Sequence, residues 1–239
     1  MSSYHNAVSD KLVVFLYPTR SVFTVFSKDN ILKFSSDNGS SSMLPIELQG
    51  AIFSTTDTIS VAARATLTPL ADESYSSYFQ ANFGQAHQEL KHQSTNDFTI
   101  VYEATPVTKE LLHEVVNPQE HSDIHLMHTY AAAMRYENAI YYWLYNDTVS
   151  LLVWKEGRLV LTNRYKSDTK DEVFYYIMLA VEQLELPADK LHFGFVGSKA
   201  EHAVYQVMFQ NYLPPLHLCS TGSSTDIDEL AQFFAECVL

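Results

Sequence analysis

Three histidines lie within eight residues and form the densest group of histidines in the chain. His121, His125 and His128 could in principle gather imidazoles around zinc. We expect a strand over residues 123–128, on which His125 and His128 would point to opposite faces, because three residues is an odd step. A helix would instead place His121 and His125 on one face. No cysteine lies beside them, so we expect solvated or hydrogen-bonded histidines and no metal site.

An aromatic run forms a second candidate site, here for binding a protein. It spans Tyr141 to Tyr145, and strand alternation would put Tyr141, Trp143 and Tyr145 on the face opposite Tyr142. Core packing is one interpretation of these rings. The other is an exposed stripe that anchors an interface, since Tyr and Trp are enriched in such positions.

Motifs of common enzymes are absent. The chain has no G-x-S-x-G, H-E-x-x-H or G-x-x-x-x-G-K-[ST] pattern. A nuclease of the RNase H type would need several carboxylates on its central strands to hold two metals. The expected strand centres at 13–16 and 141–144 carry none, and no catalytic residue is predicted.

The composition indicates a folded, acidic protein. The 239 residues are 46% hydrophobic and carry a formal charge of −13, which disfavours the phosphate contacts that dominate nucleic-acid affinity. The first apolar run, at 12–17, is too short for a membrane span or signal core. We therefore expect a cytoplasmic protein that binds neither nucleic acid nor membranes. Its two cysteines, Cys219 and Cys237, are expected to be buried free thiols.

The elements expected to position these residues are clearest in the second half of the chain. Three strands joined by tight turns are followed by a helix with a capping box formed by Thr169 and Glu172. Strands and helices then alternate, which indicates parallel strands with crossovers. The expected strands are 139–145, 149–154, 159–165, 192–196 and 216–220, and the later helices are 200–212 and 226–238. This is the order of an RNase H-like lobe.

The first half begins in the same way and then becomes less regular. Strands are expected at 12–17, 22–27, 31–35, 58–66 and 98–103, and helices at 44–53, 72–83 and 105–116. Pro45 suits the first turn of the helix at 44–53. The repeated three-strand opening predicts a duplicated fold, with an N-terminal lobe at 1–136 and a C-terminal lobe at 137–239.

Three stretches carry a resemblance to a known family. They are Thr66-Leu67-Thr68-Pro69, the run from Leu161 to Tyr165, and the run from Asp171 to Leu184. With the topology above, the chain resembles an uncharacterised bacterial family of unknown function whose members have an actin-like ATPase fold. The resemblance implies an α/β fold of two RNase H-like lobes, with mixed sheets of three antiparallel strands followed by alternating helices and strands.

Active members of that superfamily hold phosphates with two hairpin turns that carry an acid and glycines. The matching turns, 17–21 and 145–149, contain no glycine, and Pro18 removes a backbone donor from the first. In the second, Asp147 beside Thr148 could hold a Mg²⁺-bound water, or could simply form the turn. The third element is a glycine-containing turn near the base, and Gly194, Gly197 and Ser198 match it. A strand that enters a helix through glycine is also ordinary packing between strand and helix, so both interpretations stay open.

Two functions remain open. The first is a non-catalytic actin-like module, without cofactor, that binds another protein or itself through the cleft between lobes or a sheet edge. The alternative is a degenerate nucleotide-binding protein or slow ATPase that uses ATP and Mg²⁺.

Overall fold

The structure is a computed structural model, which describes residues 9–37, 39, 44–61, 64–68, 74–96, 98–105, 118–219 and 229–238. Contacts between residues divide the chain into two compact units, 1–126 with 234–239, and 127–233. The lobe boundary at residues 136 and 137 stays a prediction. Helices α3 (Asp123–Met134) and α6 (Glu229–Val238) each contribute residues to both units.

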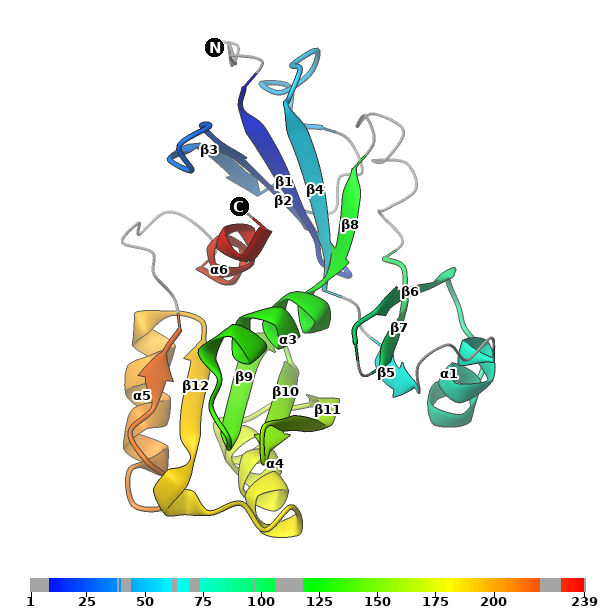
Figure 1. The fold of residues 1–239 in the computed structure, drawn as a ribbon. Helices are drawn as coiled ribbons and strands as arrows, with labels where there is room; N and C mark the ends of the chain where they lie inside the picture. Colours follow the sequence, from blue (N-terminus) through cyan, green and yellow to red (C-terminus); the bar gives the residue numbers. More distant parts are fainter. Residues whose placement is uncertain are drawn as a thin grey trace. The chain divides into compact units, whose positions relative to one another are not determined.

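The first unit is built on a five-stranded mixed sheet with the order β3-β2-β1-β4-β8. Its strands are β1 (Lys11–Leu16), β2 (Ser21–Phe26), β3 (Leu32–Asp37), β4 (Thr55–Ser60) and β8 (Gln119–Ser122). The first three form an antiparallel meander, while β4 pairs with β1, and β8 with β4, in parallel (Figure 1). The alternation of apolar residues along β1 and β2 gives one face a core that contains Val14, Leu16 and Phe23.

The segment that connects β3 to β4 corrects the predicted helix at 44–53. It forms successive short turns, with the amide of Leu48 donating to Pro45 O and the amide of Ala51 donating to Leu48 O. Leu48 is fully buried, whereas Ile46 and Ile52 are exposed. Pro45 suits a helical first turn, but Gly50 has φ 76°, which lies outside the helical region, so the turns do not continue as a helix.

A small antiparallel sheet, in the order β5-β7-β6, follows β4 in the chain. It consists of β5 (Ala65–Thr68), β6 (Leu90–Ser94) and β7 (Thr99–Glu103), with α1 (Tyr75–Phe83) between β5 and β6. The predicted strand at 58–66 is therefore parts of two strands in different sheets, and β6 lies where only a polar stretch was expected. The predicted helix at 105–116 falls almost wholly outside the described residues.

Side chains join this small sheet to β8. The Gln93 side-chain amide bonds to the β8 backbone in the way that a neighbouring strand would. Its Nε2 donates to Glu120 O at 2.8 Å, and its Oε1 accepts from the Ser122 amide at 2.7 Å. Lys91 forms an ion pair with Glu120. These bonds satisfy backbone groups on the edge of β8 that does not pair with β4.

The second unit repeats the sheet order of the first, as β11-β10-β9-β12-β13. Its strands are β9 (Ala139–Tyr145), β10 (Thr148–Lys155), β11 (Arg158–Lys166), β12 (His192–Val196) and β13 (His217–Leu218). Three strands are antiparallel and the next two parallel. The predicted duplication is confirmed at the level of topology. The small sheet with α1, inserted between β4 and β8, explains why the first half looked irregular.

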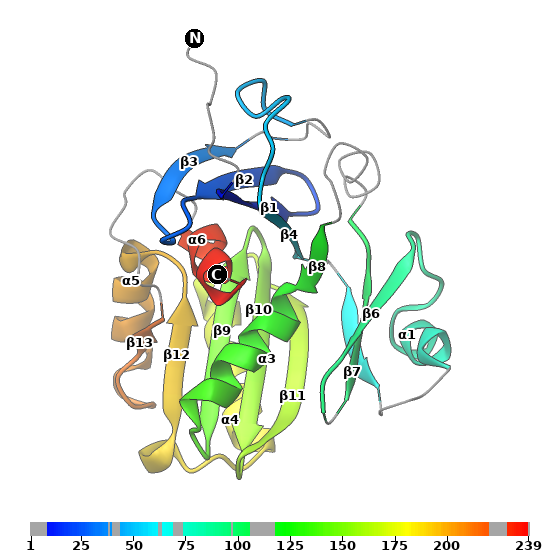
Figure 2. The same cartoon turned by 45° about the horizontal axis from the view of Figure 1, so that its top comes forward.

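Helices cover both faces of this second sheet (Figure 2). On one face, α4 (Lys170–Gln183) and α5 (Lys199–Phe209) bury Val173, Ile177 and Phe209 against Tyr142 and its neighbours. On the other, Tyr130 of α3 packs edge-on against Tyr141 at 5.9 Å. A single-turn helix η1 (Ala188–Lys190) follows α4, which begins at the predicted capping box. Among the described helices, none combines the length and apolar character needed to cross a bilayer.

The start of α3 corrects the predicted strand at 123–128. The side chain of Ser122 accepts the amide of His125 at 3.1 Å, and Asp123 occupies the first turn, where an acid is favoured by the helix dipole. The strand lies just before it, at Gln119–Ser122. A serine followed by aspartate is a helix-start signal, and the predicted strand at 123–128 overlooked it.

Candidate functional site

The two glycines of the predicted nucleotide turn are surrounded by aromatic rings. A Cβ on Gly194 would stand 2.6 Å from Tyr141 Cδ1, and a Cβ on Gly197 would stand 2.4 Å from Phe195 Cζ. Both distances are far below van der Waals contact, so a side chain at either position would force the neighbouring ring to move. The packing of rings therefore accounts for both glycines without a ligand.

Ser198 begins α5 and takes part in a complete capping box. Its Oγ accepts the Glu201 amide at 3.1 Å, and Glu201 Oε2 accepts the Ser198 amide at 3.2 Å. Ser198 Oγ also donates to the same carboxylate at 2.8 Å. Helix N-termini attract anions because their amides lack partners. At α5, the chain supplies its own carboxylate to that position.

The turn from β9 to β10 contains Asp147 and Thr148. Asn146 has φ 50°, as a tight hairpin requires, and Asp147 O accepts the Ser167 amide. The carboxylate of Asp147 is more than half exposed and lies 3.7 Å from Lys166 Nζ. The turn therefore explains Asn146 and Asp147 structurally, while the Asp147 carboxylate remains accessible to solvent.

The turn from β1 to β2 carries an arginine in place of an acid. Arg20 Nη1 bonds to Asp37 at 2.5 Å, and its guanidinium lies 4.6 Å from the Tyr17 ring centre. Burial raises the pKa of the Asp37 carboxyl, but hydrogen bonds from the Gly39 amide and Arg20 outweigh it, so the pKa is lowered.

The aromatic stripe of β9 is buried. Tyr142 faces the core under α4 and α5, and Tyr141 faces the opposite side, so the predicted alternation is confirmed. Tyr141 and Trp143 have no exposed surface, and Tyr145 is half-buried. Neither Tyr141 nor Trp143 is therefore available on the surface of this structure as an interface anchor. Burial raises the pKa of the Tyr141 phenol well above its usual value.

The three clustered histidines have separate surroundings. His121 on β8 contacts the buried carboxylate of Asp57 on β4, Nε2 to Oδ1 at 3.0 Å. The pKa of His125 is lowered by burial and by nearby His121. His128 stacks on Trp154 with ring centres 5.3 Å apart. Within the described part of the chain, no three His, Cys, Asp or Glu side chains are grouped closely enough to bind a metal.

The Asp57 and His121 pair was missed by sequence reasoning. Asp57 lies in the run Thr55-Thr56-Asp57-Thr58, and an acid inside a strand that is expected to be buried is a usable signal, because such an acid needs a partner. A carboxylate beside an imidazole fixes its tautomer and can hold a proton. Here the pair joins two parallel strands of the first sheet.

The cysteines are free, as expected. Cys219 is buried and burial raises its thiol pKa to about 11, which makes it a poor nucleophile. Cys237 is half-buried rather than buried.

Solved structures share this architecture. A protein of unknown function with an actin-like ATPase fold from Bacteroides thetaiotaomicron is 14% identical, aligns over 88% of this chain and 91% of its own, and has a TM-score of 0.72. The ethanolamine utilization protein EutJ from Carboxydothermus hydrogenoformans is 10% identical, over 99% and 91%, with a TM-score of 0.50. The cytoplasmic domain of EpsL from Vibrio cholerae is 13% identical, over 96% and 94%, also with a TM-score of 0.50.

These similarities give the chain the actin-like ATPase fold, with two lobes built on the sheets around β1 and β9. No curated protein matches the sequence significantly. The family described as protein of unknown function (DUF3822) matches residues 68–216, which is more than half of the 239 residues. This protein belongs to the DUF3822 family.

Proposed function

We propose that this protein is a non-catalytic actin-like module that acts by binding other protein molecules. The observation that carries the proposal is the Glu201 carboxylate at the N-terminus of α5, hydrogen-bonded to Ser198. A phosphate at that position would have to displace a carboxylate, which is also negatively charged. With Gly194 and Gly197 explained by ring packing, the turn from β12 to α5 has a complete structural role.

The turn from β1 to β2 supports the same proposal. Phosphate cradles use free backbone amides, and Pro18 has none. The Tyr17 amide donates to Arg20 O, and the Ser21 amide donates to Gly39 O, so the first and last amides of the turn are already engaged. Arg20 itself is paired with Asp37.

A structural neighbour provides a precedent for the binding role. EpsL is an inner membrane component of the type II secretion system, and its cytoplasmic domain has this fold. The fold therefore occurs in a component of a larger protein assembly. For this chain, that precedent supports a role as a binding module and does not identify a partner.

A degenerate nucleotide-binding protein or slow ATPase is the competing function, and one observation favours it. Val196 pairs in parallel with Trp143, so the turns that follow β9 and β12 lie at the same end of the second sheet. The exposed carboxylate of Asp147 is at that end and could hold a Mg²⁺-bound water beside a nucleotide.

Titration calorimetry with ATP and Mg²⁺ separates the two functions. We expect no saturable binding at ATP concentrations up to about 1 mM, which corresponds to a binding free energy weaker than about −4 kcal/mol. Micromolar binding that is lost in Asp147→Ala, but kept in Asp189→Ala, would overturn the proposal. Asp189 is a suitable control because it is an exposed acid of the same unit, on η1.

A further inference from the structure

Helix α5 has an unusual distribution of polar and apolar side chains. His202 and Gln206 turn inward and hold the backbone of Leu216, with His202 Nε2 2.7 Å from Leu216 O and Gln206 Oε1 accepting the Leu216 amide at 2.7 Å. Tyr205 and Phe209 complete the inward face. The polar side chains of this helix that would normally face water therefore lie on its inward face.

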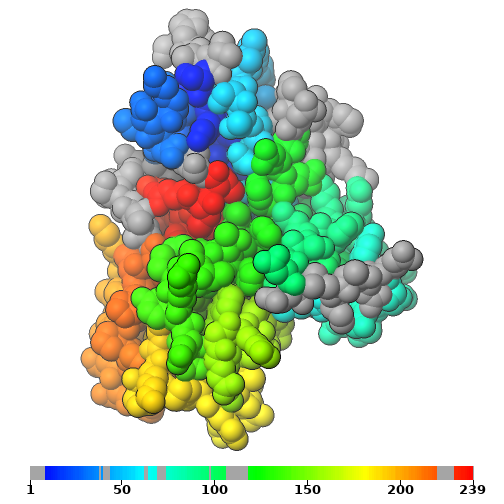
Figure 3. All heavy atoms as spheres, viewed as in Figure 1, coloured from blue at the N-terminus to red at the C-terminus, as the bar shows by residue number. Residues whose placement is uncertain are grey.

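The outward face of α5 is apolar. Ala200, Ala203, Val204 and Val207 are all exposed, Val207 to 62% of its surface. Their spacing of three, one and three residues places them along one line of the helix. Figure 3 shows α5, in orange, at the surface of the second unit. From 202 to 212 the chain carries no acidic residue, lysine or arginine.

We infer that α5 pairs with α5 of a second copy of this chain, antiparallel about a two-fold axis between Ala203 and Val204. In that register, Ala200 lies opposite Val207 of the second copy, and Ala203 lies opposite Val204. Each alanine then packs against a valine of the other copy. Parallel pairing would instead set valine against valine and alanine against alanine, which packs less well. The surface is self-complementary, as a two-fold contact requires.

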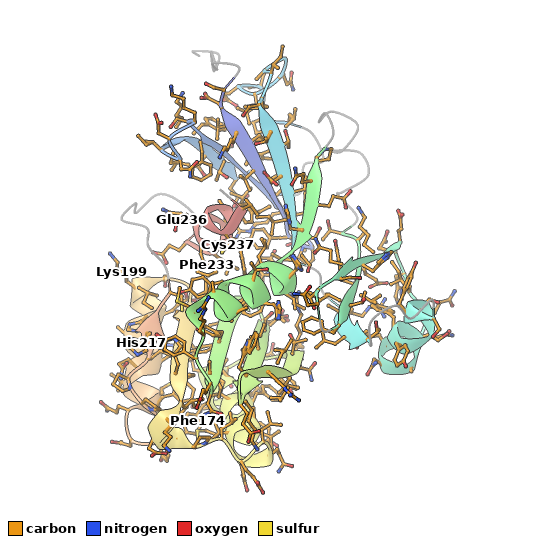
Figure 4. The ribbon with its side chains drawn as sticks, viewed as in Figure 1. Phe174, Lys199, His217, Phe233, Glu236 and Cys237 are labelled. Carbon is orange, nitrogen blue, oxygen red and sulfur yellow. The ribbon has the colours of Figure 1, made fainter. Side chains whose placement is uncertain are left out.

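The α5 face adds no charge that would oppose a second copy. Each chain carries −13, so two copies repel at long range, and contact through the neutral α5 face brings no like charges together. A basic partner would find no acid along this line of residues. Lys199, at the N-terminal end of α5 (Figure 4), would lie near the C-terminal end of the opposing helix, where the dipole is negative.

The small area of contact between the two α5 helices limits the strength of the pairing. A stable dimer buries about 800 Å² on each copy, which one helix of 11 residues cannot supply. We therefore expect a weak contact, with a Kd on the order of 100 µM, that matters at high local concentration.

Sedimentation equilibrium of the full chain, from about 10 µM to about 500 µM, tests the pairing. We expect concentration-dependent dimers in the native protein and at least tenfold weaker association in Val207→Glu, because a charge would be buried against Ala200. Val160→Glu is the matched control, since Val160 is a similarly exposed valine on β11. Its association should be unchanged.

A mixing experiment tests the register. Ala200→Lys alone should also weaken pairing, but a mixture of Val207→Glu and Ala200→Lys chains should restore it, because antiparallel packing sets that lysine opposite that glutamate. A native protein that stays monomeric at about 500 µM, or variants that do not complement each other, would overturn the inference. The inference rests on the proposed binding role, yet the two fail separately, since a monomer would leave the ATP titration unaffected.

Discussion

At the scale of single residues, Gly194 is fixed by its neighbour on the next strand. The place of its missing Cβ is 2.6 Å from Tyr141 Cδ1 and 3.0 Å from Cys219 Sγ. Tyr141 is fully buried and also contacts Tyr130, so its ring has little freedom to move away. The close approach of β12 to β9 side chains therefore depends on glycine.

Gly194→Ala is expected to destabilise the protein by about 1–3 kcal/mol through overpacking. Urea denaturation measures the loss. The same substitution in a Tyr141→Val background should cost much less, because the ring is gone. An equal cost in both backgrounds would show that the ring contact is not the reason for the glycine.

A second residue-scale feature is a column of three rings around His192. The Tyr136 and His217 rings stack on the His192 ring, with ring centres 3.8 Å and 4.8 Å away. The Tyr141 ring is tilted against it, with ring centres 5.4 Å apart. Burial, followed by the charge of His217, lowers the pKa of His192 to about 4. The folded protein therefore favours a neutral imidazole at this position.

Stability should fall as the pH drops from about 6.5 to 4. The unfolded chain takes up a proton on His192 near pH 6.5, whereas the folded chain does so only near pH 4, so acid favours unfolding in this window. His192→Phe keeps a ring in the column and removes the titration. Thermal unfolding at several pH values should show a smaller acid-induced loss in the variant, by about 1–2 kcal/mol after allowing for the partial exposure of the ring. Parallel pH curves would contradict this account.

At the scale of elements, the outcome of the sequence predictions depended on local signals. The α4 helix was found because its capping box and apolar stripe are both local. The start of α3 was missed although Ser122 and Asp123 signal it, because the histidines were read as part of a strand. The segment at 44–53 was misassigned because Pro45 matched a helix start, whereas Leu48 is buried, Ile46 and Ile52 are exposed, and Gly50 has a positive φ.

The capping box of α4 gives a prediction at this scale. Thr169 Oγ1 accepts the Glu172 amide at 3.2 Å, and Glu172 Oε2 accepts the Thr169 amide at 3.0 Å. Thr169→Ala should cost about 1 kcal/mol of unfolding free energy. Lys170→Ala, at an exposed first-turn position without a capping bond, is the control and should change stability far less. Equal effects in chemical denaturation would remove the capping explanation.

The hydrogen bonds from Gln93 on β6 to the β8 backbone give a second prediction for these elements. Gln93→Leu would leave Glu120 O and the Ser122 amide without the bonds that Gln93 supplies, at a cost of about 1–3 kcal/mol. The specific readout is hydrogen exchange, which should become faster at the Ser122 amide. Gln80→Leu, on the exposed side of α1, should leave that amide unchanged. Unaltered exchange in the Gln93 variant would contradict the link.

At the scale of the whole molecule, repetition explains what sequence could and could not predict. Two sheets with the same strand order were predicted from a repeated three-strand opening, because turns and alternation are visible locally. The candidate sites were harder to predict, since they depend on contacts between distant residues. Asp57 and His121 are 64 positions apart. The capping box of Ser198 and Glu201 is by contrast a local S-x-x-E signal, and it was overlooked.

Net charge governs the last prediction. Two chains of −13 each repel one another, and the α5 surface offers no ion pair that salt could weaken. Raising NaCl from about 50 mM to about 500 mM shortens the screening length from roughly 14 Å to roughly 4 Å and should therefore strengthen self-association of the native protein. Sedimentation at both ionic strengths measures this, with Val207→Glu as the variant that should associate weakly in each. Association that weakens with salt would instead point to a contact made by ion pairs, and therefore to a surface other than α5.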